Sequence, residues 1–164
     1  MVARSMDAGR LMVLSFAGLQ AGVFCGLLTL LWYFLVSLFV YNSLWMIPNF
    51  FAAVFYQASS VRDDFGFYTC SGMAAHILFS ATVGMIYAWI IPENIRWGRS
   101  LLFAFVYVIF LEGLWRTWIG NEFNPWMRVY IPLLSSWIAC IIFGFGISII
   151  PYLIRSMQKN FLLK

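Results

Sequence analysis

The chain carries very little charge for its length. Only 10% of its 164 residues are charged, and no charged residue stands between Arg10 and Arg62. Soluble domains carry about a quarter charged residues, so this scarcity excludes water as the main solvent of the surface. The Lys and Arg residues are scattered between apolar segments and form no basic stripe, so we expect no nucleic acid partner.

Histidine and cysteine are also scarce. The one histidine is His76, and the three cysteines Cys25, Cys70 and Cys140 stand far apart with no C-x-x-C pair. This spacing excludes a metal site built from clustered His and Cys, and it is typical of cysteines that pack as small apolar residues. The sequence also has no G-x-S-x-G motif, no phosphate-binding glycine loop and no second histidine for an acid–base pair. We therefore predict that the protein is not an enzyme and has no catalytic residues.

Long apolar segments make up most of what is present. Hydrophobic residues account for 63% of the chain and aromatic residues for 20%. Runs of more than about 18 apolar residues are typical of transmembrane helices. The sequence therefore predicts an all-α polytopic membrane protein, with residues 1–164 forming one transmembrane domain. The four predicted spans cover about 11–39, 65–91, 100–119 and 130–154.

The apolar segment at about 45–61 is broken by Pro48 and Asn49. It is rich in aromatic residues, which collect at the membrane–water interface. We predict an interfacial helix here, between the first and second spans. The sequence leaves open whether this helix lies flat or dips inward as a re-entrant segment.

Lys and Arg residues near the ends of the spans predict the orientation. Seven lie on the side of the two termini and three on the opposite side. The seven are Arg4, Arg10, Arg96, Arg99, Arg155, Lys159 and Lys164, and the three are Arg62, Arg116 and Arg128. Since cytoplasmic loops are enriched in these residues, we expect both termini in the cytoplasm. We expect the membrane to be a bacterial inner membrane.

Small residues recur at every fourth position in three of the predicted spans. The rows are Gly18, Gly22 and Gly26 in the first span, Gly72, Ser80 and Gly84 in the second, and Ser136, Cys140, Gly144 and Ser148 in the fourth. Such rows allow helix backbones to approach closely in a membrane. They are expected either to pack the helices of this chain together or to dock on helices of partner proteins.

The second row contains His76 in the place where another small residue would stand. Counted inward from Phe67, His76 lies about 13 Å along its helix, and Glu112 lies about 10 Å inward from Ile119. These two depths are similar, and Arg116 follows Glu112 by one helical turn. The sequence therefore predicts a polar cluster of His76, Glu112 and Arg116 in the outer half of the membrane.

Three interpretations of this cluster stay open. In the first, Glu112 and Arg116 form a structural ion pair and His76 bonds to a neighbouring helix. In the second, the ionisable groups belong to a proton or ion path. Such a path needs further polar residues, and the spans carry few of them in the inner half of the membrane. In the third, His76 is the axial ligand of a chlorophyll or haem, and Gly72 leaves room for the flat macrocycle.

The third interpretation rests on a local resemblance of the sequence around His76 to a known family. A small residue four positions before the histidine is similar to the pattern in bacterial light-harvesting polypeptides, where that histidine binds the pigment. This resemblance implies that His76 and Gly72 form a cofactor site. The chain departs from that family in having four predicted spans where an antenna polypeptide has one.

The segments "IPNFFAA" and "SGMAAHILFSATVGMIYA" give the whole chain its resemblance to small uncharacterised bacterial four-helix membrane proteins. That resemblance implies a fold but no chemistry. We expect a non-catalytic accessory or structural subunit that packs its small-residue rows against partner subunits in a larger, energy-transducing membrane complex. A tetrapyrrole-binding subunit and a homo-oligomeric transporter or channel are the alternatives. The expected partners are other membrane protein subunits and lipids.

Overall fold

The computed structural model describes residues 8–162, apart from the side chains at 119, 121 and 160–162. Every regular element in this part of the chain is helical, and four helices are long and apolar enough to cross a membrane. These four are Ala8–Tyr41, Phe67–Ile90, Trp97–Trp118 and Leu133–Lys159. The structure confirms the predicted all-α polytopic fold, and the chain is an integral membrane protein.

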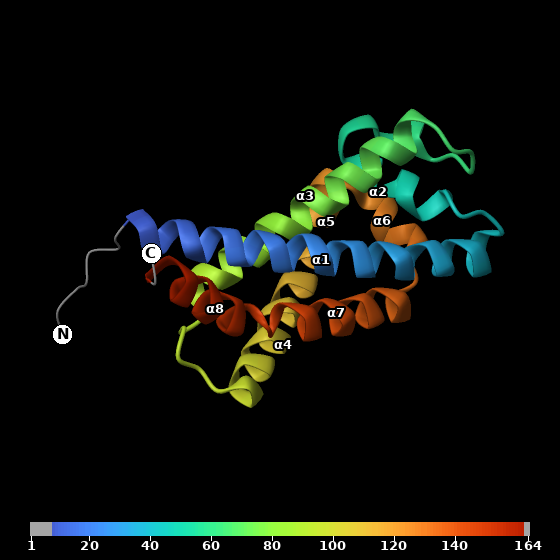
Figure 1. Ribbon diagram of the computed structural model, residues 1–164. Helices are drawn as coiled ribbons and strands as arrows, with labels where there is room; N and C mark the ends of the chain where they lie inside the picture. The colour runs from blue at the N-terminus through green and yellow to red at the C-terminus, as the bar shows by residue number, and fades with distance from the viewer. Residues whose placement is uncertain (1–7, 163–164) are drawn as a thin grey trace.

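Shorter helices connect and extend these four (Figure 1). In chain order the elements are α1 Ala8–Tyr41, α2 Met46–Tyr56, the 3-10 turn η1 Gln57–Ser60, α3 Phe67–Ile90, α4 Trp97–Leu114, the π-helical turn η2 Trp115–Ile119, α5 Gly120–Phe123, α6 Pro125–Tyr130, α7 Leu133–Ile147 and α8 Ile150–Leu162. The predicted third span thus consists of α4 and η2, and the fourth of α7 and α8.

Close backbone contact joins α1 to α3. A Cβ atom on Gly18 would lie 2.6 Å from both the carbonyl oxygen of Gly84 and the Cα of Met85. A Cβ atom on Gly22 would lie 2.8 Å from the Cα of Ala81. Only glycine allows such an approach, so the rows of the first two spans pack against each other within this chain.

The remaining small residues also contact neighbours inside the chain. Gly72 packs against the backbone of Pro48 on α2. Gly144 on α7 lies against the ring of Phe105 on α4, and the carbonyl oxygen of Ser148 accepts a 2.7 Å hydrogen bond from Ser100. All three rows therefore face other helices of the same chain.

The fourth span is broken into α7 and α8 close to Pro151. Proline has no N–H, so Pro151 cannot donate to the carbonyl four residues before it, and its ring crowds the preceding turn. At the same point Ile149 donates to Gly146, three residues back, at 3.4 Å. Beyond the break, Ile150 and Ile154 of α8 are fully buried in the core that includes α1.

The predicted helix at 45–61 forms as α2 and η1, and its first half is buried. Residues 47–53 are all buried, and α2 packs on α1, α3 and α6. Asn49 holds the following loop, since its side chain donates to the carbonyl oxygens of Arg62 at 2.8 Å and Asp64 at 3.0 Å and accepts from Thr69 at 2.7 Å. A helix therefore forms in the predicted segment and packs on the bundle, and its position relative to the membrane stays a prediction.

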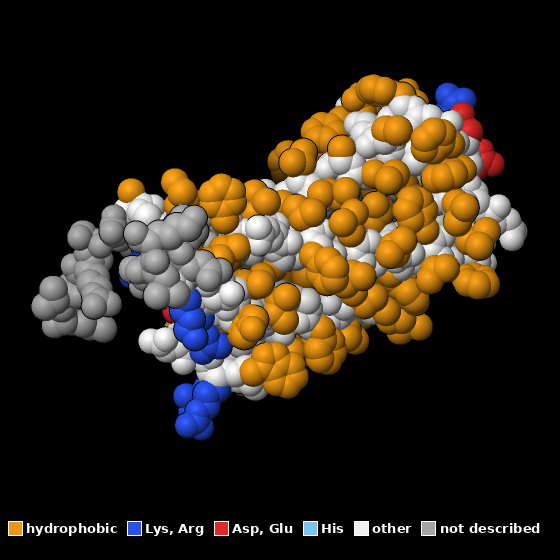
Figure 2. All heavy atoms as spheres, in the orientation of Figure 1, with side chains coloured by type: hydrophobic (Ala, Val, Ile, Leu, Met, Phe, Trp, Pro, Cys, Tyr) orange, Lys and Arg blue, Asp and Glu red, His pale blue; other side chains and the backbone are white. Residues whose placement is uncertain are grey.

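On the face shown in Figure 2, charged side chains lie at the two ends of the molecule and apolar side chains cover most of the surface between them. At one end Glu93 accepts from Arg10 at 2.7 Å and from Gln158 at 2.9 Å. These bonds tie together the start of α1, the loop after α3 and the middle of α8. We call this the basic end, defined by Arg10, Arg96, Arg99, Arg155 and Lys159. Arg4 and Lys164, which entered the prediction of orientation, lie outside the described residues.

Candidate functional site

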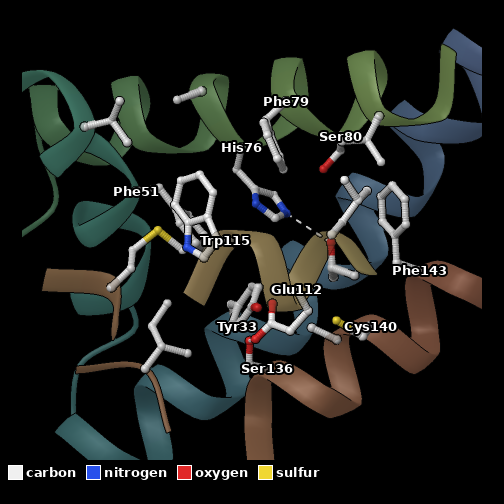
Figure 3. Close-up of a pocket in the computed structure, with 18 of the residues that line it drawn as sticks. Tyr33, Phe51, His76, Phe79, Ser80, Glu112, Trp115, Ser136, Cys140 and Phe143 are labelled. Carbon is white, nitrogen blue, oxygen red and sulfur yellow. Dashed lines mark hydrogen bonds between the residues drawn. The ribbon is translucent and has the colours of Figure 1, made fainter. Parts of the chain in front are cut away.

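A cavity of about 450 Å³ lies between α3 and the α4–α7 pair (Figure 3). It forms because α3 packs on α1 and α4 packs on α7, while α3 and α4 scarcely contact each other. Side chains of α1, α2, α5 and α6 complete the lining. The walls are mostly apolar, and the polar groups in the lining come from α1, α3, α4, η2, α6 and α7.

The cavity has a mouth on the apolar outer surface. On the side toward the basic end, the hydroxyls of Tyr87 and Tyr107 bridge α3 and α4 by donating to the carbonyl oxygens of Ser100 and Val83, each at 3.0 Å. Beyond these bridges two lining residues of α3 lie partly outside: Leu78 is 68% exposed and Phe79 is 52% exposed. The cavity therefore opens sideways, in the region that the bilayer covers.

An ion pair forms one wall. Arg116 donates from Nε to Oε1 of Glu112 at 2.5 Å, and Ser136 on α7 donates to the same oxygen at 2.5 Å. The Glu112 side chain is only 11% exposed. The Cys140 thiol on α7 also bonds to the Glu112 carboxylate. A carboxylate has about four acceptor positions, so this group can still accept a further donor on the cavity wall.

The π-helical turn η2 starts directly after α4 and contributes its first two residues, Trp115 and Arg116, to the lining. In such a turn the N–H bonds to the fifth residue back, as Gly120 does to the carbonyl oxygen of Trp115. The extra residue changes the direction of the side chains relative to a regular helix. π-Helical turns occur frequently at functional sites.

The ring of His76 lies on the side of the cavity opposite Glu112 (Figure 3). Its Nε2 lies 3.0 Å from the hydroxyl oxygen of Thr29 on α1. That hydroxyl has one proton and already donates it to the carbonyl oxygens of Cys25 at 3.0 Å and Gly26 at 3.1 Å. Thr29 therefore accepts from His76, which assigns the proton to Nε2 and leaves a lone pair on Nδ1.

The Nδ1 atom of His76 faces the cavity. The hydrogen bonds of His76 go to α1: Nε2 bonds to the Thr29 hydroxyl, and the ring also bonds to the backbone of Gly26. No described side chain bonds to Nδ1, and no buried side-chain nitrogen or oxygen in the described residues lacks a partner. Nδ1 is therefore accessible, and Figure 3 shows it turned toward the interior near Trp115. The cavity thus presents an unused hydrogen-bond acceptor in an apolar setting.

Aromatic rings hold His76 in this position. Phe51 of α2 stacks on it with ring centroids 4.5 Å apart and an angle of 17° between the planes. Tyr33 of α1 meets His76 edge to face at 5.9 Å and Phe51 at 5.2 Å. Three helices thus fix the imidazole, and the contact with Phe51 explains why α2 is buried.

The structure brings the three residues of the predicted polar cluster to one cavity. Glu112 and Arg116 are paired, whereas His76 bonds to Thr29 and to neither of them. Gly72, the other residue of the predicted cofactor site, is covered by α2 and does not line the cavity. No group of three or more His, Cys, Asp or Glu residues that could hold a metal occurs in residues 8–162.

Sequence reasoning missed Thr29, Tyr33, Phe51 and Trp115 as site residues. Thr29 follows Gly26 by three positions, so it lies on the face of α1 that carries the glycine row. A polar residue continuing a row of small residues is a signal that could have identified it. The three aromatic residues carry no such signal in a chain with 33 Phe, Trp and Tyr residues.

Comparisons with protein-family models, with curated proteins and with solved structures found no match for this chain. The class that the observations support is a four-span integral membrane protein with a cavity open to the bilayer.

Proposed function

We propose that the protein is a non-enzymatic membrane protein that binds a small lipophilic molecule in the His76 cavity. The observation that carries this proposal is the accessible Nδ1 of His76 in an otherwise mostly apolar cavity of about 450 Å³. Ligand sites are typically apolar clefts of about 300–1,000 Å³ with a small number of well-placed polar groups. The cavity between α3 and α4 has both properties.

The position of the mouth defines how the ligand enters. Leu78 and Phe79 line the cavity and are also exposed on the apolar surface. A molecule dissolved in the bilayer enters there without crossing a polar layer. The apolar part of the ligand stays near this opening and its polar group reaches inward to His76.

The basic end lies in the cytoplasm in this proposal, because it carries most of the Lys and Arg residues. The membrane is then a bacterial inner membrane, and the cavity lies toward its outer leaflet. The predicted role as an accessory subunit is the second candidate. Its support is the apolar face of α4 that is exposed on the surface. This face includes Leu102, Phe103, Val106, Ile109 and Phe110. The small-residue rows do not support it, since they contact helices of the same chain.

Filling the cavity tests the proposal. The variant Ala75→Phe places a ring at a position that lines the cavity, while Ala74→Phe places the same ring on the exposed side of α3. Gently purified wild type and Ala74→Phe are expected to retain a small lipophile in native mass spectrometry, and Ala75→Phe is expected to lose it. Equal retention by all three proteins would contradict the proposal.

The same preparation separates the alternatives. Other subunits that copurify support the accessory-subunit prediction. Visible absorption that disappears in His76→Ala supports a bound tetrapyrrole. A homo-oligomer that moves ions or solutes in liposomes supports a transporter or channel.

A further inference from the structure

We infer that the ligand is a neutral lipophilic phenol or hydroquinone whose hydroxyl donates a hydrogen bond to Nδ1 of His76. This inference rests on the proposed function and names the chemistry that the cavity recognises. Three properties of the cavity lead to it: the direction of the available hydrogen bond, the balance of charge and the aromatic lining.

The hydrogen bond requires a donor on the ligand. Because the Thr29 hydroxyl donates to backbone carbonyls of its own helix, it fixes the proton of His76 on Nε2. The nitrogen that faces the cavity then has only a lone pair. A carbonyl or ether oxygen of a ligand would face Nδ1 as a second acceptor, and no hydrogen bond would form. A ligand hydroxyl donates its proton to Nδ1, so both polar groups are hydrogen-bonded.

A second acceptor lies across the cavity. Oε1 of Glu112 accepts from Arg116 and Ser136, and the Cys140 thiol also bonds to this carboxylate. Because a carboxylate has about four acceptor positions, it can accept one more donor from a ligand. Figure 3 shows Glu112 on the side opposite His76. A ring with two hydroxyls at opposite positions offers a donor toward each of these acceptors, which favours a hydroquinone over a simple phenol.

The charge of the lining favours a neutral ligand. Arg116 compensates Glu112 directly, and Arg128 also lines the cavity, so a cationic amine finds no uncompensated negative charge. An anionic ligand would meet two acceptors, Nδ1 of His76 and the Glu112 carboxylate, while Arg116 and Arg128 already have partners. Both kinds of ion would lose hydration without adequate compensation.

The rings that surround His76 favour an aromatic head group. Phe51, Tyr33, Phe79 and Trp115 all line the cavity, and Phe79 and Trp115 contact each other at 5.7 Å. Offset and edge-to-face contacts between rings add to the stabilisation from burial alone. An alkyl or isoprenoid tail on such a ring would leave through the mouth at Leu78 and Phe79.

Matched synthetic probes test the inference in full-length protein in lipid nanodiscs. The probes are 4-octylphenol, its methyl ether and 4-octylcyclohexanol, with binding measured by titration calorimetry. Wild type is expected to bind the phenol about tenfold more tightly than the ether, which lacks the donor. It is also expected to bind the phenol more tightly than the cyclohexanol, which has the donor but no aromatic ring.

The variant His76→Phe keeps the apolar volume and removes the acceptor. Its affinity for the ether should match that of wild type. Unlike wild type, it should bind the phenol and the ether about equally tightly. The ether also reports whether this variant is folded, and the comparison of probes in wild type needs no variant.

Equal binding of phenol and ether by wild type would overturn the inference while leaving the proposed function intact. If His76→Phe still binds the phenol more tightly than the ether, the inference is also overturned, and the proposed function is again unaffected. If neither probe binds wild type, or if Ala75→Phe binds both as well as wild type does, the proposed site itself is wrong.

Discussion

Arg116 and Glu112 lie one helical turn apart and are joined by a 2.5 Å bond from Nε to Oε1. Their side chains are 20% and 11% exposed, so most of this ion pair is removed from the surroundings. A second bond to the same carboxylate oxygen, from Ser136, connects the pair to α7. The pair thus fixes the position of α4 relative to α7 at the level of the cavity.

Removing one member of this pair is expected to cost more than removing both. Arg116→Met leaves the Glu112 carboxylate without its counter-charge, and we expect the free energy of unfolding to fall by about 3 kcal/mol. The double variant Glu112→Gln with Arg116→Met contains no uncompensated charge and should recover most of this loss. Reversible unfolding in mixed detergent micelles measures both. A double variant that is less stable than Arg116→Met would contradict this account.

The contact between α1 and α3 predicts opposite effects for two glycine substitutions. Gly18→Ala forces a Cβ atom to within 2.6 Å of α3 backbone atoms, and we expect a loss of about 1–3 kcal/mol in stability. Gly113→Ala on α4 meets nothing within 4 Å, so better helix propensity should raise stability by about 0.5–1 kcal/mol. The same unfolding measurement compares them. If Gly18→Ala is as stable as Gly113→Ala, the close packing described here is incorrect.

Asn49 is expected to control the order of the segment that follows η1. Asn49→Leu leaves the carbonyls of Arg62 and Asp64 and the hydroxyl of Thr69 without this partner, at a cost of about 3 kcal/mol. Hydrogen exchange should increase at residues 61–66 in this variant. Asn94→Leu, at an exposed position near the basic end, serves as the control and should leave that exchange unchanged. Unchanged exchange in Asn49→Leu would show that Asn49 does not hold this loop.

The sideways opening of the cavity predicts where a ligand tail lies. A 4-alkylphenol with a photoreactive diazirine in its tail should label the lining residues at the mouth, Leu78 and Phe79. Peptide mapping by mass spectrometry identifies the labelled sites. Excess unlabelled 4-octylphenol should prevent this labelling. Labelling that is confined to the exposed side of α1, for example at Leu19, would mean that the probe binds only at the lipid-facing surface.

Much of the fold could be predicted from the sequence because a bilayer imposes simple rules. Long apolar runs predict the four spans, and spacing alone predicts that Glu112 can meet Arg116. The break between α7 and α8 was not predicted, although Pro151 provides the signal for it. That break matters because it directs the basic part of α8 toward Glu93, which Gln158 contacts.

The cavity could not be predicted from the sequence. It exists because α3 and α4 diverge, and this divergence depends on which helix each of them packs against. The burial of α2 has the same origin, since the apolar pattern around Phe51 fits a helix on the lipid surface as well as one stacked on His76. The role of Thr29 depends on which neighbour receives its hydroxyl proton. Only the positions of the Cys25 carbonyl and the His76 ring show this.

The single histidine of this chain allows a direct test of the central claim, that His76 recognises a ligand through Nδ1. Protein labelled with ¹⁵N-histidine gives one pair of ring nitrogen resonances. The account predicts a protonated Nε2 and an unprotonated Nδ1, and it predicts that the Nδ1 resonance shifts when 4-octylphenol is added but not when its methyl ether is added. A protonated Nδ1 in the ligand-free protein, or an Nδ1 resonance that does not shift when the phenol is added, would contradict it.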